Sequence, residues 1–171
     1  ILSAQAAKTF YKRFTGLFAK EGKQMQIIKV TSNKKQYLPL LLLADEEEAM
    51  IDRYLERGIM YVLEDGGVKA ECLVTDEGDG IWEIKSLATL PQFQRRGYAK
   101  ALVNFIEVKY KGRFKILQAG TGDSPATVPF YQKLGFIRSH IIKNFFTDNY
   151  SHPIYDGGVL LTDMVYLRKQ L

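Results

Sequence analysis

Two glycine-rich turns divide an apolar part of the chain into consecutive strands. Residues 59–64 form an apolar run, and Asp65-Gly66-Gly67 after it is typical of a hairpin turn. Apolar residues at 68, 70, 72 and 74 then alternate with Lys69 and Glu71, which is the period of a strand. A second turn over residues 76–80 leads into a long strand-like run over 81–90. Tight turns of this kind predict antiparallel neighbours.

Helical patterns lie on both sides of these strands. A short helix is predicted over 36–44. Asp45 is a good N-cap for a helix over 46–57 that Gly58 ends. An apolar stripe predicts a helix up to Tyr110, stopped by Gly112. Another short helix is expected to end at residues 134–135, and further strands are expected at 25–30, 114–119, 136–146 and 159–167. This order predicts an α/β (α+β) fold: a single domain with a mixed, mostly antiparallel central sheet of about six to seven strands, flanked by helices on both faces.

The cysteine and histidine content excludes several kinds of protein. Cys72 is the only cysteine, so no internal disulfide can form, and a reducing, cytoplasmic location is expected. Two histidines with that one cysteine cannot build a standard zinc site, so no metal is expected. The longest apolar run, residues 40–44, is far too short to cross a bilayer, and no membrane partner is expected.

Positive charge is concentrated near the start of the sequence. Of the net charge of +5, residues 1–24 carry +4. A basic segment before a nearly neutral domain is a weak signal for nucleic acid, because phosphate binding needs cations gathered on one face. No nucleic-acid partner is expected, although a binding role driven by this segment is a third alternative. We interpret residues 1–24 as an N-terminal appendage, either an extra helix or a leader, and residues 25–171 as the folded domain.

The stretch from Leu87 to Ala99 joins the long strand to the striped helix. Free N–H groups and the helix dipole make such a helix start an anion site. Gly97 lets a phosphate approach the backbone, and Arg95 and Arg96 add positive charge. Composition alone is also compatible with an ordinary strand-to-helix turn that carries surface arginines.

Three motifs in this order resemble those of the GNAT superfamily of N-acetyltransferases. Residues 94–99, Gln-Arg-Arg-Gly-Tyr-Ala, resemble its Gln-x-x-Gly-x-Gly/Ala loop, and residues 129–136 resemble its Phe-Tyr-x-x-x-Gly-Phe helix. The tail over 144–164 is similar to a small bacterial subgroup with undefined substrates. The resemblance covers residues 25–171 and implies an N-acetyltransferase domain with acetyl-coenzyme A as cosubstrate. It implies coenzyme contacts at Leu87, Ala88, Thr89, Gln94, Arg95, Arg96, Gly97, Tyr98, Ala99, Lys100 and Ser124.

The resemblance also implies direct acetyl transfer to a primary amine of a small molecule or peptide. Glu83 lies where several members carry a general base, often acting through water; the alternative is a solvated glutamate paired with Lys85. Tyr131 matches the tyrosine that protonates the departing thiolate, and a phenol with a pKa of about 10 is still protonated at neutral pH. Its alternative role is to pack the helix against the sheet. Cys72 lacks an evident base partner, so no covalent intermediate is expected.

Two features of the sequence depart from the family pattern. The alternation of side chains along the long strand leads to a separate expectation. Ser124 stands where the family often has Asn, and it either bonds the coenzyme or caps a helix turn. Pro129 should delay the helix to about Val128, with Thr127 as its cap, which could displace Tyr131. On the long strand, Glu83 is expected to share a face with Lys85 and Leu87.

The segment over residues 147–158 is predicted to be a long loop on the substrate side. Aromatic and acidic side chains there would suit a cationic amine. The candidate substrate residues are Phe145, Tyr150, His152 and Asp156, with His152 also a candidate base. A dimer contact or a structural flap is an equally open interpretation, and the protein is expected to be a monomer or a homodimer. For the whole chain, the alternative function is a non-catalytic acyl-coenzyme A-binding module.

Overall fold

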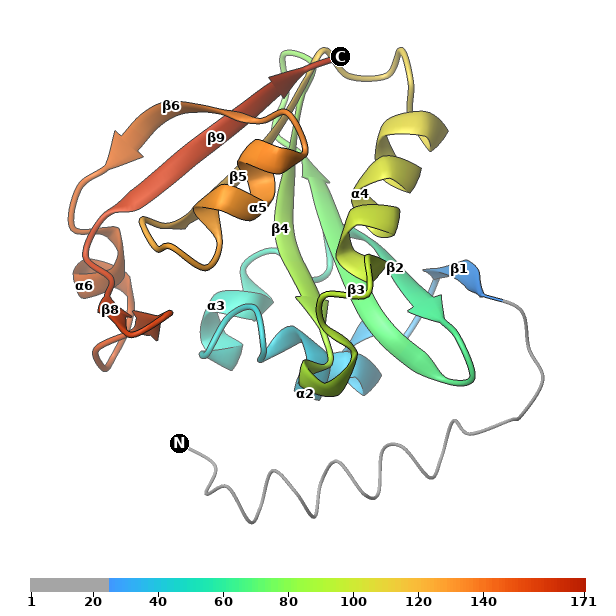
Figure 1. Ribbon diagram of the computed structural model, residues 1–171, viewed down its shortest axis with the longest axis horizontal. Coiled ribbons are helices and arrows are strands. Elements are labelled where there is room, and N and C mark those ends of the chain that lie inside the picture. The colour runs from blue at the N-terminus through green and yellow to red at the C-terminus, as the bar shows by residue number, and fades with distance from the viewer. Residues whose placement is uncertain (1–24) are drawn as a thin grey trace.

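The computed structural model describes residues 25–171, and the expected helix or leader over residues 1–24 lies outside this part (Figure 1). The elements, in chain order, are β1 (Gln26–Val30), η1 (Lys34–Tyr37), α2 (Leu38–Leu41), α3 (Glu48–Asp52), β2 (Ile59–Glu64), β3 (Val68–Asp76), β4 (Ile81–Thr89), η2 (Pro91–Phe93), α4 (Tyr98–Lys109), β5 (Ile116–Gly122), α5 (Val128–Lys133), β6 (Ile137–Ile142), α6 (Phe145–Asn149), β7 (Tyr155–Asp156), β8 (Val159–Leu160) and β9 (Met164–Gln170).

Seven of these strands form one sheet in the order β1-β2-β3-β4-β5-β9-β6. Every neighbouring pair is antiparallel except β4 and β5, which are parallel. One core lies between the sheet and α4 and α5, and includes Leu102 and Phe136. A second core lies on the opposite face under α2 and α3, and includes Leu40 and Ile51. The predicted fold class is therefore confirmed, with helices on both faces.

A β-bulge interrupts β4 in its middle. Leu73 of β3 is paired with Ser86 and Val74 with Ile84, so Lys85 has no partner residue in β3. An extra residue of this kind reverses the side-chain alternation that follows it. Leu87 therefore packs in the core under α4, together with Ile84. The expectation that Leu87 shares a face with Glu83 was wrong for this reason.

Several predicted elements differ in length from the observed ones. The helix expected over 46–57 is only α3, and the bonds from Arg53 N to Met50 O (3.2 Å) and from Tyr54 N to Ile51 O (3.1 Å) are those of tighter turns. These turns bury Tyr54 and the residue after it against the sheet. Glu71, expected on an alternating strand, is fully buried.

The C-terminal part also contains more structure than expected. The strand predicted over 136–146 ends at Ile142, and the predicted loop over 147–158 contains the end of α6 and most of the small β7–β8 hairpin. The strand expected over 159–167 is split into β8 and β9. Between them, Asp163 accepts hydrogen bonds from Lys143 Nζ (2.6 Å) and from the backbone N–H of Asn144 (2.9 Å), which fixes the bend. Within residues 25–171, no helix is long and apolar enough to cross a membrane.

Candidate active site

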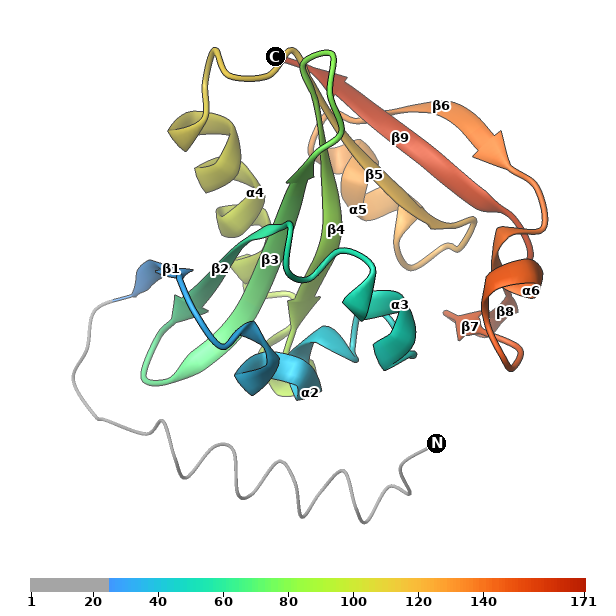
Figure 2. The ribbon, with the colours of Figure 1, turned by 180° about the vertical axis from the view of Figure 1, so that it is seen from behind.

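Strands β4 and β5 separate in the middle of the sheet. They pair only between Ile81–Ile84 and Ile116–Ala119. Beyond that point β4 continues along β3, while β5 continues along β9. Figure 2 shows the two strands diverging with α5 behind them. A cleft of about 260 Å³ lies at this separation, lined by residues of β4, β5, α5 and the α2–α3 connection.

Tyr131 of α5 lines the cleft from the face that carries α4. Helix α5 begins at Val128, as predicted, with Pro129 in its first turn, where a missing N–H breaks no helical bond. Burial raises the pKa of the phenol, and nearby acidic groups add to this effect, so the hydroxyl keeps its proton at neutral pH. Among the described residues, this hydroxyl has no hydrogen-bond partner.

Glu83 lies on the opposite face of β4 and is only 5% exposed. One carboxylate oxygen accepts hydrogen bonds from Lys85 Nζ (2.6 Å) and the Tyr166 hydroxyl (3.2 Å). The other accepts one from Gln118 Nε2 at 2.7 Å. The alternative interpretation of Glu83 was a solvated glutamate paired with Lys85. The pairing is observed, but the side chain is buried rather than solvated. Lys85 lines the cleft, whereas Glu83 lies behind it.

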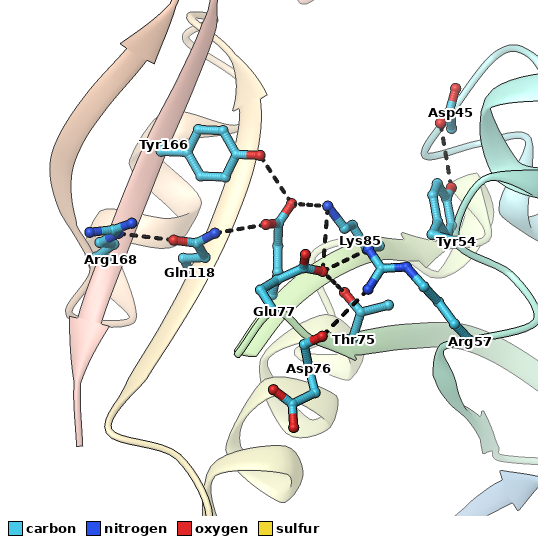
Figure 3. A network of polar contacts seen from close by, with 11 residues as sticks. Asp45, Tyr54, Arg57, Thr75, Asp76, Glu77, Lys85, Gln118, Tyr166 and Arg168 are labelled. Carbon is cyan, nitrogen blue, oxygen red and sulfur yellow. Dashed lines mark hydrogen bonds and ion pairs between the residues drawn. The ribbon is translucent and has the colours of Figure 1, made fainter. Parts of the chain in front are cut away.

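The three residues that bond to Glu83 belong to a longer polar network, in which Figure 3 labels Lys85, Gln118 and Tyr166. The side-chain oxygen of Gln118 accepts a hydrogen bond from Arg168 Nε at 2.9 Å. Lys85 Nζ also lies 3.8 Å from a carboxylate oxygen of Glu77. That oxygen accepts a hydrogen bond from Thr75 and one from Arg57 at 2.8 Å. Elements from both halves of the chain thus fix the surroundings of Glu83.

A second acid, Asp45, lines the cleft from the α2–α3 connection. Its carboxylate accepts hydrogen bonds from the hydroxyls of Tyr150 (3.1 Å) and Tyr54 (3.4 Å). Burial raises the pKa of Asp45, and these bonds oppose the rise. No lysine or arginine of the described part lies within ion-pair distance of it. Sequence reasoning assigned Asp45 only to helix capping, because nothing local to it indicates contact with Tyr150.

The loop before α4 presents unpaired backbone donors. Gly97 has φ +88° and Arg95 has φ +62°. The first backbone hydrogen bond of α4 runs from the N–H of Ala101 to the carbonyl oxygen of Gly97 at 2.9 Å. In the described part of the chain, the backbone N–H groups of residues 95–100 have no acceptor. Gln94 Nε2 donates to Thr89 O at 3.3 Å, while the buried Thr89 hydroxyl has no partner there. Such donors can hold an anion.

Ser124 and Asp156 connect α5 with the β7–β8 hairpin. The Ser124 hydroxyl donates to Asp156 and accepts from the N–H groups of Ala126 and Thr127, each at 3.2 Å. Thr127 Oγ1 also donates to Asp156 at 2.7 Å. Ser124 is 3% exposed, and its contacts are those of the capping alternative. Asp156 is nevertheless part of the cleft lining.

The other candidate substrate residues are placed differently from one another. Tyr150 lines the cleft, whereas Phe145 packs beside Phe146 in a small satellite core. His152 lies outside the lining and contacts Glu46 (3.3 Å) and Glu47 (3.2 Å). The structure therefore brings Tyr131, Tyr150 and Asp156 to one cleft, but not Phe145 or His152.

Two residues that bond to Glu83 were missed by sequence reasoning. Gln118 and Tyr166 reach Glu83 only because β5 and β9 are its neighbours in the sheet. Their alternation with apolar residues on those strands is the only local signal for them. Among the described residues, no group of three or more potential metal ligands is present.

Comparisons with known proteins agree on one family. The acetyltransferase (GNAT) domain profile matches residues 56–138. An uncharacterized N-acetyltransferase of Bacillus subtilis, YvbK, is 34% identical over 140 residues, covering 75% of this chain and 84% of the relative. A GNAT family acetyltransferase from Elizabethkingia anophelis, solved with acetyl-CoA bound, is 33% identical with a TM-score of 0.81, covering 88% of this chain and 100% of that one. A Bacillus subtilis acetyltransferase in complex with CoA is 30% identical with a TM-score of 0.78, covering 86% and 99%. The chain therefore belongs to the GNAT family of acetyltransferases.

Proposed function

We propose that residues 25–171 form an acetyl-CoA-dependent N-acetyltransferase that transfers acetyl directly to a primary amine of a small molecule or peptide. The separation of β4 from β5, which opens a cleft along the half of β4 that leads into the donor-rich loop before α4, carries this proposal. The bound acetyl-CoA of the Elizabethkingia anophelis protein and the CoA of the Bacillus subtilis protein support it.

The coenzyme is assigned to the cleft and to the loop before α4. The free N–H groups of residues 95–100 and the charges of Arg95, Arg96 and Lys100 suit a diphosphate. Beyond Ile84, β4 has no strand partner on its β5 side, so backbone groups of residues 87–89 are available to an amide-containing arm. The unpartnered Thr89 hydroxyl fits the same role. Ser124 is a weaker candidate, because its hydroxyl is already bonded to Asp156.

Tyr131 and Glu83 are assigned the proton transfers. The amine attacks the thioester carbonyl and loses a proton to Glu83, through a water molecule because Lys85 stands between Glu83 and the cleft. When the carbon–sulfur bond breaks, the Tyr131 hydroxyl gives its proton to the thiolate. Cys72 is fully buried, and burial raises the pKa of its thiol, which opposes a covalent role.

The charge of the cleft favours a cationic acceptor. Asp45, Glu46 and Asp156 line it, and its one lysine among the described residues, Lys85, is paired with Glu83. The ring of Tyr150 adds an aromatic surface that suits an ammonium group. An amine with more than one positive charge is the preferred class of acceptor.

Two measurements test the proposal. Calorimetry with acetyl-CoA should show binding at ordinary salt, and a release assay for free coenzyme thiol should identify an acceptor among polyamines, aminoglycosides, amino acids and peptide N-termini. Acetyl-CoA binding without thiol release on any amine would favour the non-catalytic module instead. No binding at millimolar acetyl-CoA would contradict both functions.

A further inference from the structure

Lys85 occupies an unusual position between two carboxylates. It is the bulged residue of β4, and bulges next to active sites redirect side chains. Its ammonium group lies 2.6 Å from Glu83 and 3.8 Å from Glu77. Its side chain is 21% exposed and lines the cleft, while the side chain of Glu83 is 7% exposed. Lys85 thus covers Glu83 on the side from which an amine proton must come.

We propose that Lys85 is a positioning residue that holds the Glu83 carboxylate by an ion pair before acetyl transfer and moves to Glu77 once Glu83 has taken up the amine proton. This inference rests on the proposed function of Glu83 as general base. The movement required is small, because the ammonium group already lies near both carboxylates. It also exposes a Glu83 oxygen to the cleft, which gives the base access to water there.

The charges balance in each step. Before transfer, Glu83 and Glu77 are carboxylates, and Lys85 is an ammonium ion bonded to Glu83. The ammonium form of the acceptor passes one proton through water to Glu83, so the acceptor becomes a neutral amine and Glu83 becomes a carboxylic acid. After the attack, the nitrogen loses its second proton, which replaces the one that Tyr131 gives to the thiolate. Lys85 keeps its own proton throughout and pairs with the remaining carboxylate. Product release and loss of the Glu83 proton to solvent return Lys85 to Glu83.

Glu77 is suited to receive the ammonium group. Burial alone would raise its pKa, but hydrogen bonds from Thr75 and Arg57, with the charges of Lys85 and Arg57, outweigh burial and lower it. Glu77 is therefore a carboxylate at neutral pH, fixed in place from two sides. The Glu77 carboxylate is already paired with Arg57, so in the resting state Lys85 pairs with Glu83 instead.

The remaining groups around Glu83 do not replace Lys85. Gln118 and Tyr166 donate neutral hydrogen bonds to it, and Arg168 contacts Gln118 rather than Glu83. His140 stacks on the Tyr166 ring with centroids 4.5 Å apart. Lys85 is therefore the cation in direct contact with Glu83 among the described residues.

The test is the pH dependence of kcat/KM for acetyl transfer at saturating acetyl-CoA. Loss of the cation should move the acid limb of the Lys85→Met profile to higher pH, because an adjacent positive charge favours the carboxylate form of an acid. Lys85→Arg should restore the limb. Glu77→Gln should lower the plateau, because Lys85 then has no second carboxylate to accept it. Lys29→Met, at an exposed lysine of β1, is the matched control.

The outcomes separate this inference from the proposed function. An acid limb that is the same in Lys85→Met and in the wild type overturns the inference, as does failure of Lys85→Arg to restore it. If Lys85→Met does not fold, Lys85→Gln must show the same shift. Absence of acetyl transfer by the wild type, or an unchanged acid limb in Glu83→Gln, overturns the proposed function and the inference with it.

Discussion

The hydroxyl of Tyr150 donates a hydrogen bond to Asp45 over 3.1 Å, although the two residues lie 105 positions apart. The same two segments meet again where the N–H of Ser151 donates to Glu47 at 2.7 Å and where Arg53 donates to Asn149 at 3.0 Å. One side of the cleft is thus assembled from an early and a late part of the chain.

Asp45→Asn should weaken binding of a cationic acceptor. The substitution removes the negative charge but keeps the shape of the side chain, so we expect the KM of the amine to rise about tenfold. The KM of acetyl-CoA should be unchanged. Steady-state kinetics with a polyamine acceptor measure both values. Asp79→Asn, in the exposed turn before β4, is the control, and an equal effect there would contradict a specific role for Asp45.

Tyr131→Phe should slow the chemical step without weakening coenzyme binding. The substitution removes the proton that the thiolate needs, and loss of a general acid typically costs about a hundredfold in rate. The turnover rate should therefore fall, whereas the affinity for acetyl-CoA measured by calorimetry should stay the same. Tyr37→Phe, in the core under α2, controls for the loss of a buried hydroxyl. Undiminished turnover would remove Tyr131 from the mechanism.

Gly97→Ala should weaken acetyl-CoA binding through backbone strain. A Cβ at this position would meet no atom within 4 Å, so the change adds strain at φ +88° rather than a clash. Strain of this kind costs about 1–2 kcal/mol, and we expect up to about a thirtyfold loss of affinity by calorimetry. Gly78→Ala is closely matched, with φ +85° and no neighbour within 4 Å, but it lies in the β3–β4 turn. It should leave the affinity unchanged.

Glu71→Gln should change how stability depends on pH. Burial raises the pKa of Glu71 from 4.5 to about 8, against hydrogen bonds from Ser86 and Ala88. The folded state therefore holds this proton more tightly than the unfolded state, and the group's contribution to stability is complete below pH 4.5 and lost as the pH rises to about 8. Removing the titration should raise the free energy of unfolding at pH 8 by on the order of 4 kcal/mol relative to wild type.

The measurement is denaturant unfolding at several values between pH 4.5 and pH 8. The difference between Glu71→Gln and the wild type should grow steadily across this window. Glu56→Gln, at an exposed position, should run parallel to the wild type. A constant difference for Glu71→Gln would mean that the carboxyl does not titrate in this range.

Sequence patterns predicted the sheet, its flanking helices and the loop at Gly97, because local turns and apolar periodicity determine them. Glu71 could not be identified as buried, since a carboxyl group on an alternating strand looks solvent-facing until α2 and α3 cover that side. The bulge at Lys85 was equally invisible, because it follows from pairing with β3. The cleft itself depends on where β4 leaves β5, which no local pattern records.

The residues of the candidate site fall into two kinds, those that lie in a sequence motif and those that are brought together only by folding. Gly97 and Tyr131 lie in motifs whose spacing along the chain identifies them. Asp45, Gln118 and Tyr166 become site residues only through contacts between distant segments. A single sequence predicts the first kind of residue well and the second kind poorly.

Strand β4 serves two chemically different surfaces on either side of its extra residue. Before it, Glu83 faces the polar network; after it, Ser86 bonds to Glu71 on that same side at 2.6 Å, while Leu87 turns to the core under α4. Deleting position 85 would leave these orientations unchanged, because Ile84 and Ser86 already pair with consecutive residues of β3, and would remove only the ammonium group beside Glu83. The bulge therefore adds one cationic side chain at the cleft without changing which residues of β4 face each side of the sheet.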